Sequence, residues 1–84
     1  MKRVEIYTKS YCPFCQRAKE LLRIKGVSFI EHDVTTDPLR EREMRERSGR
    51  TTVPEIFIEG VLLGGCDDLF ELDEKGELNP LLGI

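Results

Sequence analysis

Two cysteines, Cys12 and Cys15, are separated by two residues where a strand-like pattern gives way to a helix-like one. Thiols at this spacing can form and break a disulfide, with one of them acting as a thiolate nucleophile. Alternating apolar and polar residues over 4–8 predict the strand, and residues 9–11 the bend after it. Pro13 suits the first position of a helix, where its missing N–H costs nothing. We therefore expect Cys12 at the N-cap of this helix, with its sulfur facing unpaired backbone donors.

Cys12 needs surroundings that stabilise a thiolate, because a free cysteine with a pKa of about 8.5 is only roughly 3% ionised at neutral pH. The helix dipole contributes about 0.3 to 1 kcal/mol, which is less than one pKa unit, so hydrogen bonds and a cation must add to it. Lys9 lies three residues upstream, and Gln16 and Arg17 replace the acids usual in a first turn. Cys15 lies one turn further into the helix, where its sulfur is more shielded. We predict that Cys12 attacks and Cys15 resolves.

A zinc site is the alternative for a pair of cysteines at this spacing. Zinc would need two further ligands, and only Cys66 and His32 remain as candidates. His32 falls in the second predicted strand, where a surface histidine or one satisfied within the fold is the commoner finding. The residues therefore favour redox chemistry, and we expect no metal and no tightly bound cofactor.

Length, charge and cysteine content narrow the class of protein further. The 84 residues predict one small domain, 1–84, with room for one modest core. The net charge of -3, with acids and bases interspersed, argues against a nucleic-acid partner. Glu5 and Lys9 interrupt the apolar positions after the basic start, so we expect no signal peptide, and no apolar run predicts a membrane span. An odd count of three cysteines fits a working dithiol in a cytoplasmic protein better than a disulfide framework.

A strand–helix–strand unit is predicted around the cysteine pair. The helix can end at Gly26, and residues 27–34, rich in Val, Phe and Ile, predict a second strand. This strand is parallel to the first if the helix is a right-handed crossover. The apolar stripe of the helix consists of Phe14, Ala18, Leu21 and Leu22.

A second helix is predicted from Asp37-Pro38, an N-cap followed by a first-turn proline, to Ser48-Gly49. Its apolar residues are few, mainly Leu39 and Met44. Charge pairs at i, i+4 spacing are expected between Glu41 and Arg45 and between Glu43 and Arg47. A solvated helix laid on the sheet is the preferred interpretation, and a docking surface for a partner is the alternative.

The second half of the chain predicts a hairpin and a third helix. Residues 52–58 read as a strand, Glu59-Gly60 as a two-residue turn, and residues 61–63 as the antiparallel partner. Pro54 cannot donate to a ladder and belongs at the start of its strand, where the segment alone favours a trans bond.

The paired glycines Gly64-Gly65 precede Cys66, Asp67 and a helix that Gly76 can end. Such glycines leave backbone N–H groups open to an anion such as a carboxylate. A tight turn with acidic N-capping explains the same residues, and the sequence leaves both interpretations open.

Taken together, five separated motifs resemble those of the glutaredoxin family in order and spacing, over nearly the whole chain. The likeness is closest to its small bacterial members with two active-site thiols. It implies an α/β protein of thioredoxin-like fold, ordered βαβαββα, with a mixed four-stranded sheet flanked by helices and a short turn over 78–82. It also implies that Pro54 is cis, against the expectation from its own segment. The motifs are Tyr7-Thr8-Lys9, Cys12-Pro13-Phe14-Cys15, Arg47-Ser48-Gly49, Thr52-Val53-Pro54 and Gly64-Gly65-Cys66-Asp67-Asp68.

The resemblance implies a glutathione groove, carried over by position. Lys9 and groups around Arg50 resemble the basic side that receives a glutathione carboxylate. Thr52 and Val53 would offer backbone groups to the peptide as a strand does. The implied glutathione-binding residues are Lys9, Cys12, Pro13, Phe14, Thr52, Val53, Pro54, Gly65, Cys66 and Asp67.

The other end of the implied groove would hold the γ-glutamyl group. Gly65, Cys66 and Asp67 would supply N–H groups for its carboxylate and the Asp67 side chain for its ammonium, while Phe14 lines the groove. Cys66 is the leftover thiol, which we expect to line the groove or to oxidise slowly, without a catalytic duty.

The resemblance also implies the reaction and its partners. Cys12 attacks a disulfide, Cys15 or glutathione resolves the mixed disulfide, and glutathione, a co-substrate, restores the dithiol. The substrates implied are protein disulfides, including that of ribonucleotide reductase, and protein–glutathione mixed disulfides. NADPH enters only through glutathione reductase, and the protein is expected to be a monomer.

Two residues depart from the pattern common in the family. Phe14 stands where many relatives have Tyr, which removes a hydroxyl near the thiols but keeps the ring. Glu55 stands where Gln is common. We expect an exposed, screened carboxylate there, which would modestly oppose the Cys12 thiolate and alter the choice of partner.

Two other functions remain open. An iron–sulfur carrier with a glutathione-ligated cluster is typical of related proteins that read Cys-Gly-Phe-Ser, whereas Pro13 and Cys15 differ here. A hydrogen donor served by thioredoxin reductase would not need the groove formed by Thr52-Val53-Pro54 and Gly65-Cys66-Asp67.

Overall fold

The structure, a computed structural model, describes residues 2–84. The predicted order of elements is confirmed, and the short C-terminal turn is a helix of its own. Within the described residues, no helix combines the length and apolar character that crossing a membrane requires. The elements are β1 (Val4–Thr8), α1 (Pro13–Ile24), β2 (Ile30–Asp33), α2 (Pro38–Ser48), β3 (Glu55–Ile58), β4 (Val61–Gly64), α3 (Cys66–Glu74) and α4 (Leu78–Leu82).

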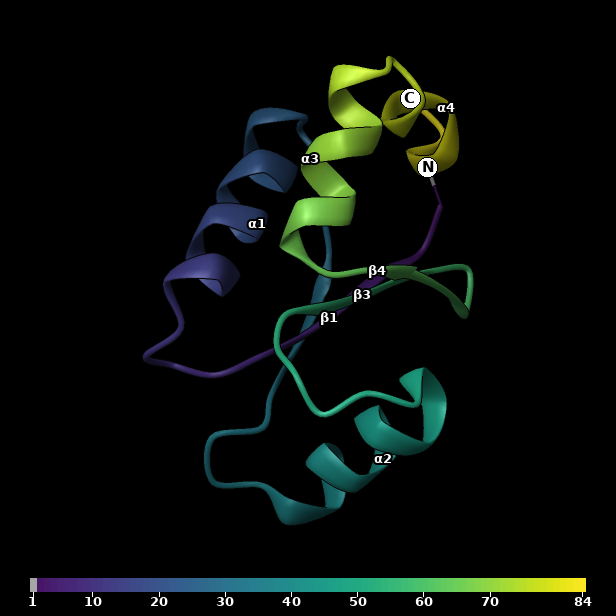
Figure 1. Cartoon of the computed structure of the whole chain (residues 1–84). Coiled ribbons are helices and arrows are strands. Elements are labelled where there is room, and N and C mark those ends of the chain that lie inside the picture. The colour runs from purple at the N-terminus through teal and green to yellow at the C-terminus, as the bar shows by residue number, and fades with distance from the viewer. Residues whose placement is uncertain (1) are drawn as a thin grey trace.

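The four strands form one mixed sheet in the order β2-β1-β3-β4. β1 pairs with β2 in parallel, while β3 is antiparallel to both β1 and β4. Figure 1 shows α1, α3 and α4 on one side of the sheet and α2 alone on the other. The predicted fold class, a mixed four-stranded sheet flanked by helices, is confirmed.

β2 and β3 are shorter than the predicted ranges of 27–34 and 52–58. The Val27 N–H donates to the Leu22 carbonyl at 3.0 Å. Val27 therefore completes the end of α1 and does not join β2. Pro54 has no N–H to offer a ladder, so β3 begins after it. Glu59 (φ 51°) and Gly60 (φ 79°) form the predicted hairpin turn, with both residues in the left-handed region.

Capping residues set the limits of the helices near the site as predicted. Cys12 is the N-cap of α1, and Pro13 occupies its first turn. The Asp37 side chain caps α2 by accepting from the Arg40 N–H at 3.1 Å. Gly49, with φ 71°, ends α2 in the left-handed conformation and lets the chain leave the helix sharply.

The side of the sheet under α1, α3 and α4 carries the main apolar core. Successive residues of a strand point to opposite faces, so Val4 and Ile6 of β1 face this core. Phe14 is an exception to the predicted stripe of α1, because its side chain is 52% exposed at the first turn, beyond the sheet. The core residues include Val4, Ile6, Ala18, Leu22, Ile56, Leu69, Leu78 and Leu82.

The side under α2 combines a small apolar cluster with buried charges. Met44 is fully buried there, whereas Leu39 is 78% exposed, so only one of the two predicted apolar contacts of α2 exists. Tyr7 and Phe57 pack edge to face beneath the helix.

The ion pairs of α2 differ from the predicted ones. Arg47 reaches across to the buried Glu5 of β1 and donates to the Tyr7 hydroxyl at 2.7 Å, while Glu43 accepts from the same hydroxyl. The expected Glu43–Arg47 pair is therefore wrong, because both side chains turn inward to satisfy polar groups of β1. The pairs along the helix are Arg40–Glu43 and Arg42–Glu46.

Candidate active site

The Cys12 sulfur lies at the N-terminus of α1 and accepts the Cys15 backbone N–H at 3.1 Å. This bond satisfies one of the amide groups that every helix leaves unpaired at its start. The Cys12 thiol also lies 3.8 Å from the Val53 carbonyl, within the range of a thiol donor. Its side chain is largely covered, with 8% exposed. Cys12 is thus largely covered and contacts the segment around Val53.

Cys15 lies behind it in a different environment, fully buried in α1. Burial raises the pKa of the Cys15 thiol to about 12, and the hydrogen bond with Cys12 adds to the rise. All three cysteines of the described chain are free thiols. The two sulfurs of the pair therefore differ in exposure, and burial opposes ionisation of the Cys15 thiol.

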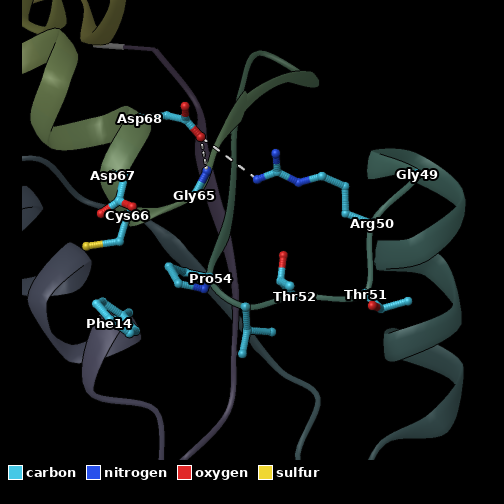
Figure 2. Close-up of a pocket in the computed structure, with 11 residues that line it drawn as sticks. Phe14, Gly49, Arg50, Thr51, Thr52, Pro54, Gly65, Cys66, Asp67 and Asp68 are labelled. Carbon is cyan, nitrogen blue, oxygen red and sulfur yellow. Dashed lines mark hydrogen bonds and ion pairs between the residues drawn. The ribbon is translucent and has the colours of Figure 1, made fainter.

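A groove of about 640 Å³ opens beside the cysteine pair (Figure 2). One wall comes from the start of α3, and the other comes from the segment between α2 and β3, with Phe14 of α1 at the cysteine end. The Val53–Pro54 bond in this segment is cis, as the resemblance implies and against the segment's own preference. The lining residues are Phe14, Gly49, Arg50, Thr51, Thr52, Val53, Pro54, Gly65, Cys66, Asp67 and Asp68.

The wall between α2 and β3 contains a charge pair with a buried acid. Arg50 Nε donates to Glu55 Oε2 at 3.1 Å, and the Thr52 hydroxyl donates to the same oxygen at 2.9 Å. Glu55 Oε1 lies 3.1 Å from Arg50 Nη2 as an ion pair, yet no group among residues 2–84 meets hydrogen-bond geometry with it. The hydrogen bond and charge of Glu55 raise the pKa of the Arg50 guanidinium.

Glu55 corrects one expectation from the sequence. Its side chain is completely buried, not exposed and screened, because its backbone opens β3 on the face that lies under α2. A buried carboxylate requires a partner, and Arg50 provides it. The guanidinium remains 44% exposed and points from this pair toward the groove.

The α3 wall is built from backbone and its own acid. The Gly65 N–H donates to Asp68 Oδ2 at 2.8 Å, so the chain itself caps this turn. Of the two interpretations that the sequence left open, acidic capping explains the Gly65 N–H. Asp68 also lies 3.9 Å from Arg50 across the groove. Cys66 is 5% exposed on this wall, and burial raises the pKa of its thiol.

The groove brings together most of the residues expected to bind glutathione: Phe14, Thr52, Val53, Pro54, Gly65, Cys66 and Asp67. Lys9, Cys12 and Pro13 lie outside its lining, although Cys12 contacts it through the Val53 carbonyl. Gly49, Thr51 and Asp68 line it without having been expected, and Arg50 was expected only loosely. For Gly49, Arg50 and Thr51 the signal lay in the sequence, since residues 49–54 form one continuous segment between a helix-ending glycine and a strand.

Among residues 2–84, no group of three or more His, Cys, Asp or Glu side chains gathers in a way that could hold a metal ion. His32, the candidate fourth ligand, instead stacks on the Tyr7 ring with centroids 4.7 Å apart. It lies beneath α2, on the opposite face of β1 from the apolar core.

Residues 4–63, most of the chain, match the sequence model of the glutaredoxin family. The chain belongs to the glutaredoxin family. Family membership and the cysteine pair make it a thiol-disulfide oxidoreductase with a thioredoxin-like fold, as the sequence predicted. The matched range covers the cysteine pair and the segment of the groove before β3.

Individual glutaredoxins support the assignment over the full length. Glutaredoxin 3 of Escherichia coli (strain K12) is 57% identical over 82 residues, which cover 98% of this chain and 99% of that protein. The solution structure of glutaredoxin from Brucella melitensis is 52% identical, with a TM-score of 0.85, covering 98% of this chain and 89% of the other. The crystal structure of a buckwheat glutaredoxin–glutathione complex is 28% identical, with a TM-score of 0.88, covering 98% of this chain and 77% of the other.

Proposed function

We propose that this glutaredoxin uses glutathione to reduce protein disulfides and protein–glutathione mixed disulfides, with Cys12 as the nucleophile and Cys15 as the resolving thiol. The main support is the contrast between the two thiols. Cys12 sits at a helix N-cap and contacts the wall of a groove, whereas Cys15 is fully buried behind it. The likeness to a glutaredoxin solved with glutathione supports the choice of co-substrate.

The reaction proceeds by two disulfide exchanges. The Cys12 thiolate attacks one sulfur of the substrate disulfide, a new S–S bond forms at Cys12, and the other substrate sulfur leaves as a thiolate that takes up a proton. The Cys15 sulfur or a glutathione thiolate then attacks Cys12 and releases the second substrate thiol. After reduction of a protein disulfide, two molecules of glutathione restore the dithiol and leave as glutathione disulfide. With a glutathionylated protein, Cys12 takes the glutathionyl group, and one glutathione thiolate attacks its sulfur to free Cys12 and form glutathione disulfide. Glutathione reductase reduces this disulfide with NADPH.

The groove accommodates glutathione along its length. Arg50 and Lys9 receive the glycyl carboxylate, and the backbone at Thr52 and Val53 pairs with the peptide as an added strand. Phe14 and Pro13 border the thiol at Cys12. These groups hold the glutathione sulfur in line with the Cys12 sulfur.

At the α3 end, the γ-glutamyl carboxylate lies against the first backbone N–H groups of the helix at Cys66 and Asp67. The Asp67 carboxylate pairs with the ammonium group. The Gly65 N–H already donates to Asp68, so it gives the ligand no hydrogen bond. Gly65 instead lets the ligand come close to the backbone.

We propose that the protein acts in the cytoplasm as a monomer, with glutathionylated proteins and disulfide enzymes such as ribonucleotide reductase as its substrates. No tightly bound cofactor takes part in this scheme. Its partners do not include nucleic acid or membranes.

Turnover of a glutathionylated peptide and of a protein disulfide by the wild type, Cys12→Ser and Cys15→Ser tests the proposal. We expect Cys12→Ser to abolish both activities and Cys15→Ser to retain only the reaction with the glutathionylated peptide, since glutathione can resolve that intermediate. Activity that survives without Cys12 would contradict the assignment. So would turnover by thioredoxin reductase alone, and visible absorbance after anaerobic purification would point to an iron–sulfur cluster.

A further inference from the structure

Lys19 is a buried lysine on the same face of α1 as Cys15, one helical turn further along. Its side chain is 10% exposed, and its Nζ donates to Glu31 Oε2 of β2 at 2.9 Å. A buried ammonium is costly unless it is paired, and in this protein the pair spans the helix and the edge strand. The exchange chemistry described above assigns no role to it.

Glu31, whose side chain is 33% exposed, accepts a second hydrogen bond besides that of Lys19. The Thr8 hydroxyl of β1 donates to the same Oε2 atom at 2.7 Å, so this oxygen accepts two hydrogen bonds. Burial alone would raise the pKa of Glu31, but the hydrogen bonds from Lys19 and Thr8 outweigh it and the pKa is lowered. The carboxylate is therefore ionised at neutral pH, and the ammonium position is fixed between α1 and the sheet.

The charges around Cys15 have opposing effects on its ionisation. Its full burial opposes a thiolate, and a thiolate at Cys12 would oppose it further. A backbone hydrogen bond from Lys9 and the positive charge of Lys19 act in the other direction. On β2, Glu31 and the exposed Asp33 partly offset that positive charge, since both carboxylates face Lys19.

We propose that Lys19 is a positioning residue for the resolving step, in which its ammonium stabilises the Cys15 thiolate and Glu31 limits this stabilisation. The inference rests on the proposed dithiol function. In the step concerned, the Cys15 S–H loses its proton, its sulfur bonds to Cys12, and the S–S bond to the substrate breaks. The departing substrate thiolate takes up a proton, so no further oxidant or reductant is needed.

A stopped-flow experiment with one equivalent of dithiobis(nitrobenzoate), a chromogenic aromatic disulfide, separates the attack by Cys12 from the resolving step. Attack by Cys12 releases the first thionitrobenzoate anion, and attack by Cys15 on the resulting mixed disulfide releases the second together with a proton. In Cys15→Ser the second phase is absent, so this variant gives the amplitude of the first phase alone. Any second release that remains in it shows that Cys66 attacks the mixed disulfide. The rate of the second phase is the quantity of interest.

The two charge variants should change the second phase in opposite directions. One unit of thiol pKa changes the thiolate population tenfold, and the accompanying change in nucleophilicity, with a slope of about 0.4 to 0.5, cancels part of it. We therefore expect Lys19→Gln to slow the second phase about threefold and Glu31→Gln to accelerate it about threefold, with the first phase changed less than about twofold. A purely structural role would slow both variants.

Lys25→Gln is the matched control, because Lys25 forms a partly buried ion pair with Asp73 at the opposite end of α1. It should leave the second phase unchanged. Thermal unfolding of every variant identifies a temperature at which all are folded. If Lys19→Gln does not fold, Glu31→Gln alone tests the inference. An unchanged or slower second phase in Glu31→Gln then overturns it. First-phase release at the wild-type rate in Cys12→Ser would instead overturn the proposed function.

Discussion

The two walls of the groove are built on different principles. On the α3 wall, a glycine turn carries the lining residues, and Asp68 holds this turn by accepting the Gly65 N–H at 2.8 Å. On the wall between α2 and β3, the Arg50 guanidinium faces the groove and is held by the completely buried Glu55. One wall therefore depends on backbone conformation, and the other depends on a single pair of charges.

This difference determines which substitutions each wall tolerates. A wall of backbone groups can accept many side chains, but it cannot accept a Cβ atom where the turn needs glycine. A wall made by one ion pair loses its charge when Arg50 is replaced, and the buried Glu55 then loses its partner. Stability measurements should therefore report on both walls, and substrate binding should report on the Arg50 wall.

The largest effect is expected from Gly64→Ala, which disrupts the α3 wall. Gly64 has φ 134°, and a Cβ added there would lie 2.2 Å from Asp68 Oδ2. Strain of about 1 to 3 kcal/mol and loss of the cap, about 1 kcal/mol, should lower the free energy of unfolding by about 2 to 4 kcal/mol. Urea unfolding measures this loss.

Gly60→Ala is the control for conformational strain without a clash. Its φ is 79°, but an added Cβ would have nothing within 4 Å. We expect a loss of about 1 to 2 kcal/mol from the left-handed backbone alone. If Gly64→Ala costs no more than Gly60→Ala, the contact with Asp68 does not support the α3 wall.

A smaller effect, on binding, is expected from Arg50→Gln. Hydrogen bonds to a charged group contribute about 1.5 to 3 kcal/mol, so KM for a glutathionylated peptide should rise about tenfold to a hundredfold. The value of kcat should change little, because the carboxylate of glutathione is bound equally before and during the exchange. Arg42→Gln, which removes an exposed arginine of α2, is the control. Equal KM values for the two variants would remove Arg50 from the binding site.

The smallest effect is expected from Glu55→Gln, which keeps a hydrogen-bond acceptor but frees the charge of Arg50. Because the guanidinium is partly exposed and screened, the gain in attraction for a carboxylate is limited to about 0.4 to 1 kcal/mol. KM should therefore fall about twofold to fivefold, and the difference from the wild type should shrink at high salt. A rise in KM would mean that Glu55 serves mainly to position Arg50.

The elements and the cysteine pair could be predicted from the sequence because their signals are local. Asp37-Pro38 and Gly49 delimit α2, and Glu59-Gly60 makes the hairpin turn, each through backbone preferences of one or two residues. Pro13 after Cys12 likewise places a thiol at a helix N-cap. The resemblance to the glutaredoxin family also predicted seven of the lining residues of the groove.

The pairing of charges could not be predicted in the same way. Spacing along α2 suggested that Glu43 binds Arg47, yet both turn to polar groups of β1, about forty positions away in the sequence. Phe14 matched an apolar stripe but lies beyond the edge of the core. Helical periodicity identifies a face, but it does not show whether the sheet extends beneath every residue of that face.

The sequence by itself determined the order of elements, the turn residues and the position of Cys12 at the start of a helix, because these follow from the conformational limits of neighbouring residues. Only the tertiary structure decided that Glu55 is buried against Arg50, that Asp68 occupies the Gly65 N–H and that Lys19 pairs with Glu31 beside Cys15. The physical reason is desolvation. A polar group removed from water binds whichever partner the packing brings within reach, and that partner belongs to the assembled fold.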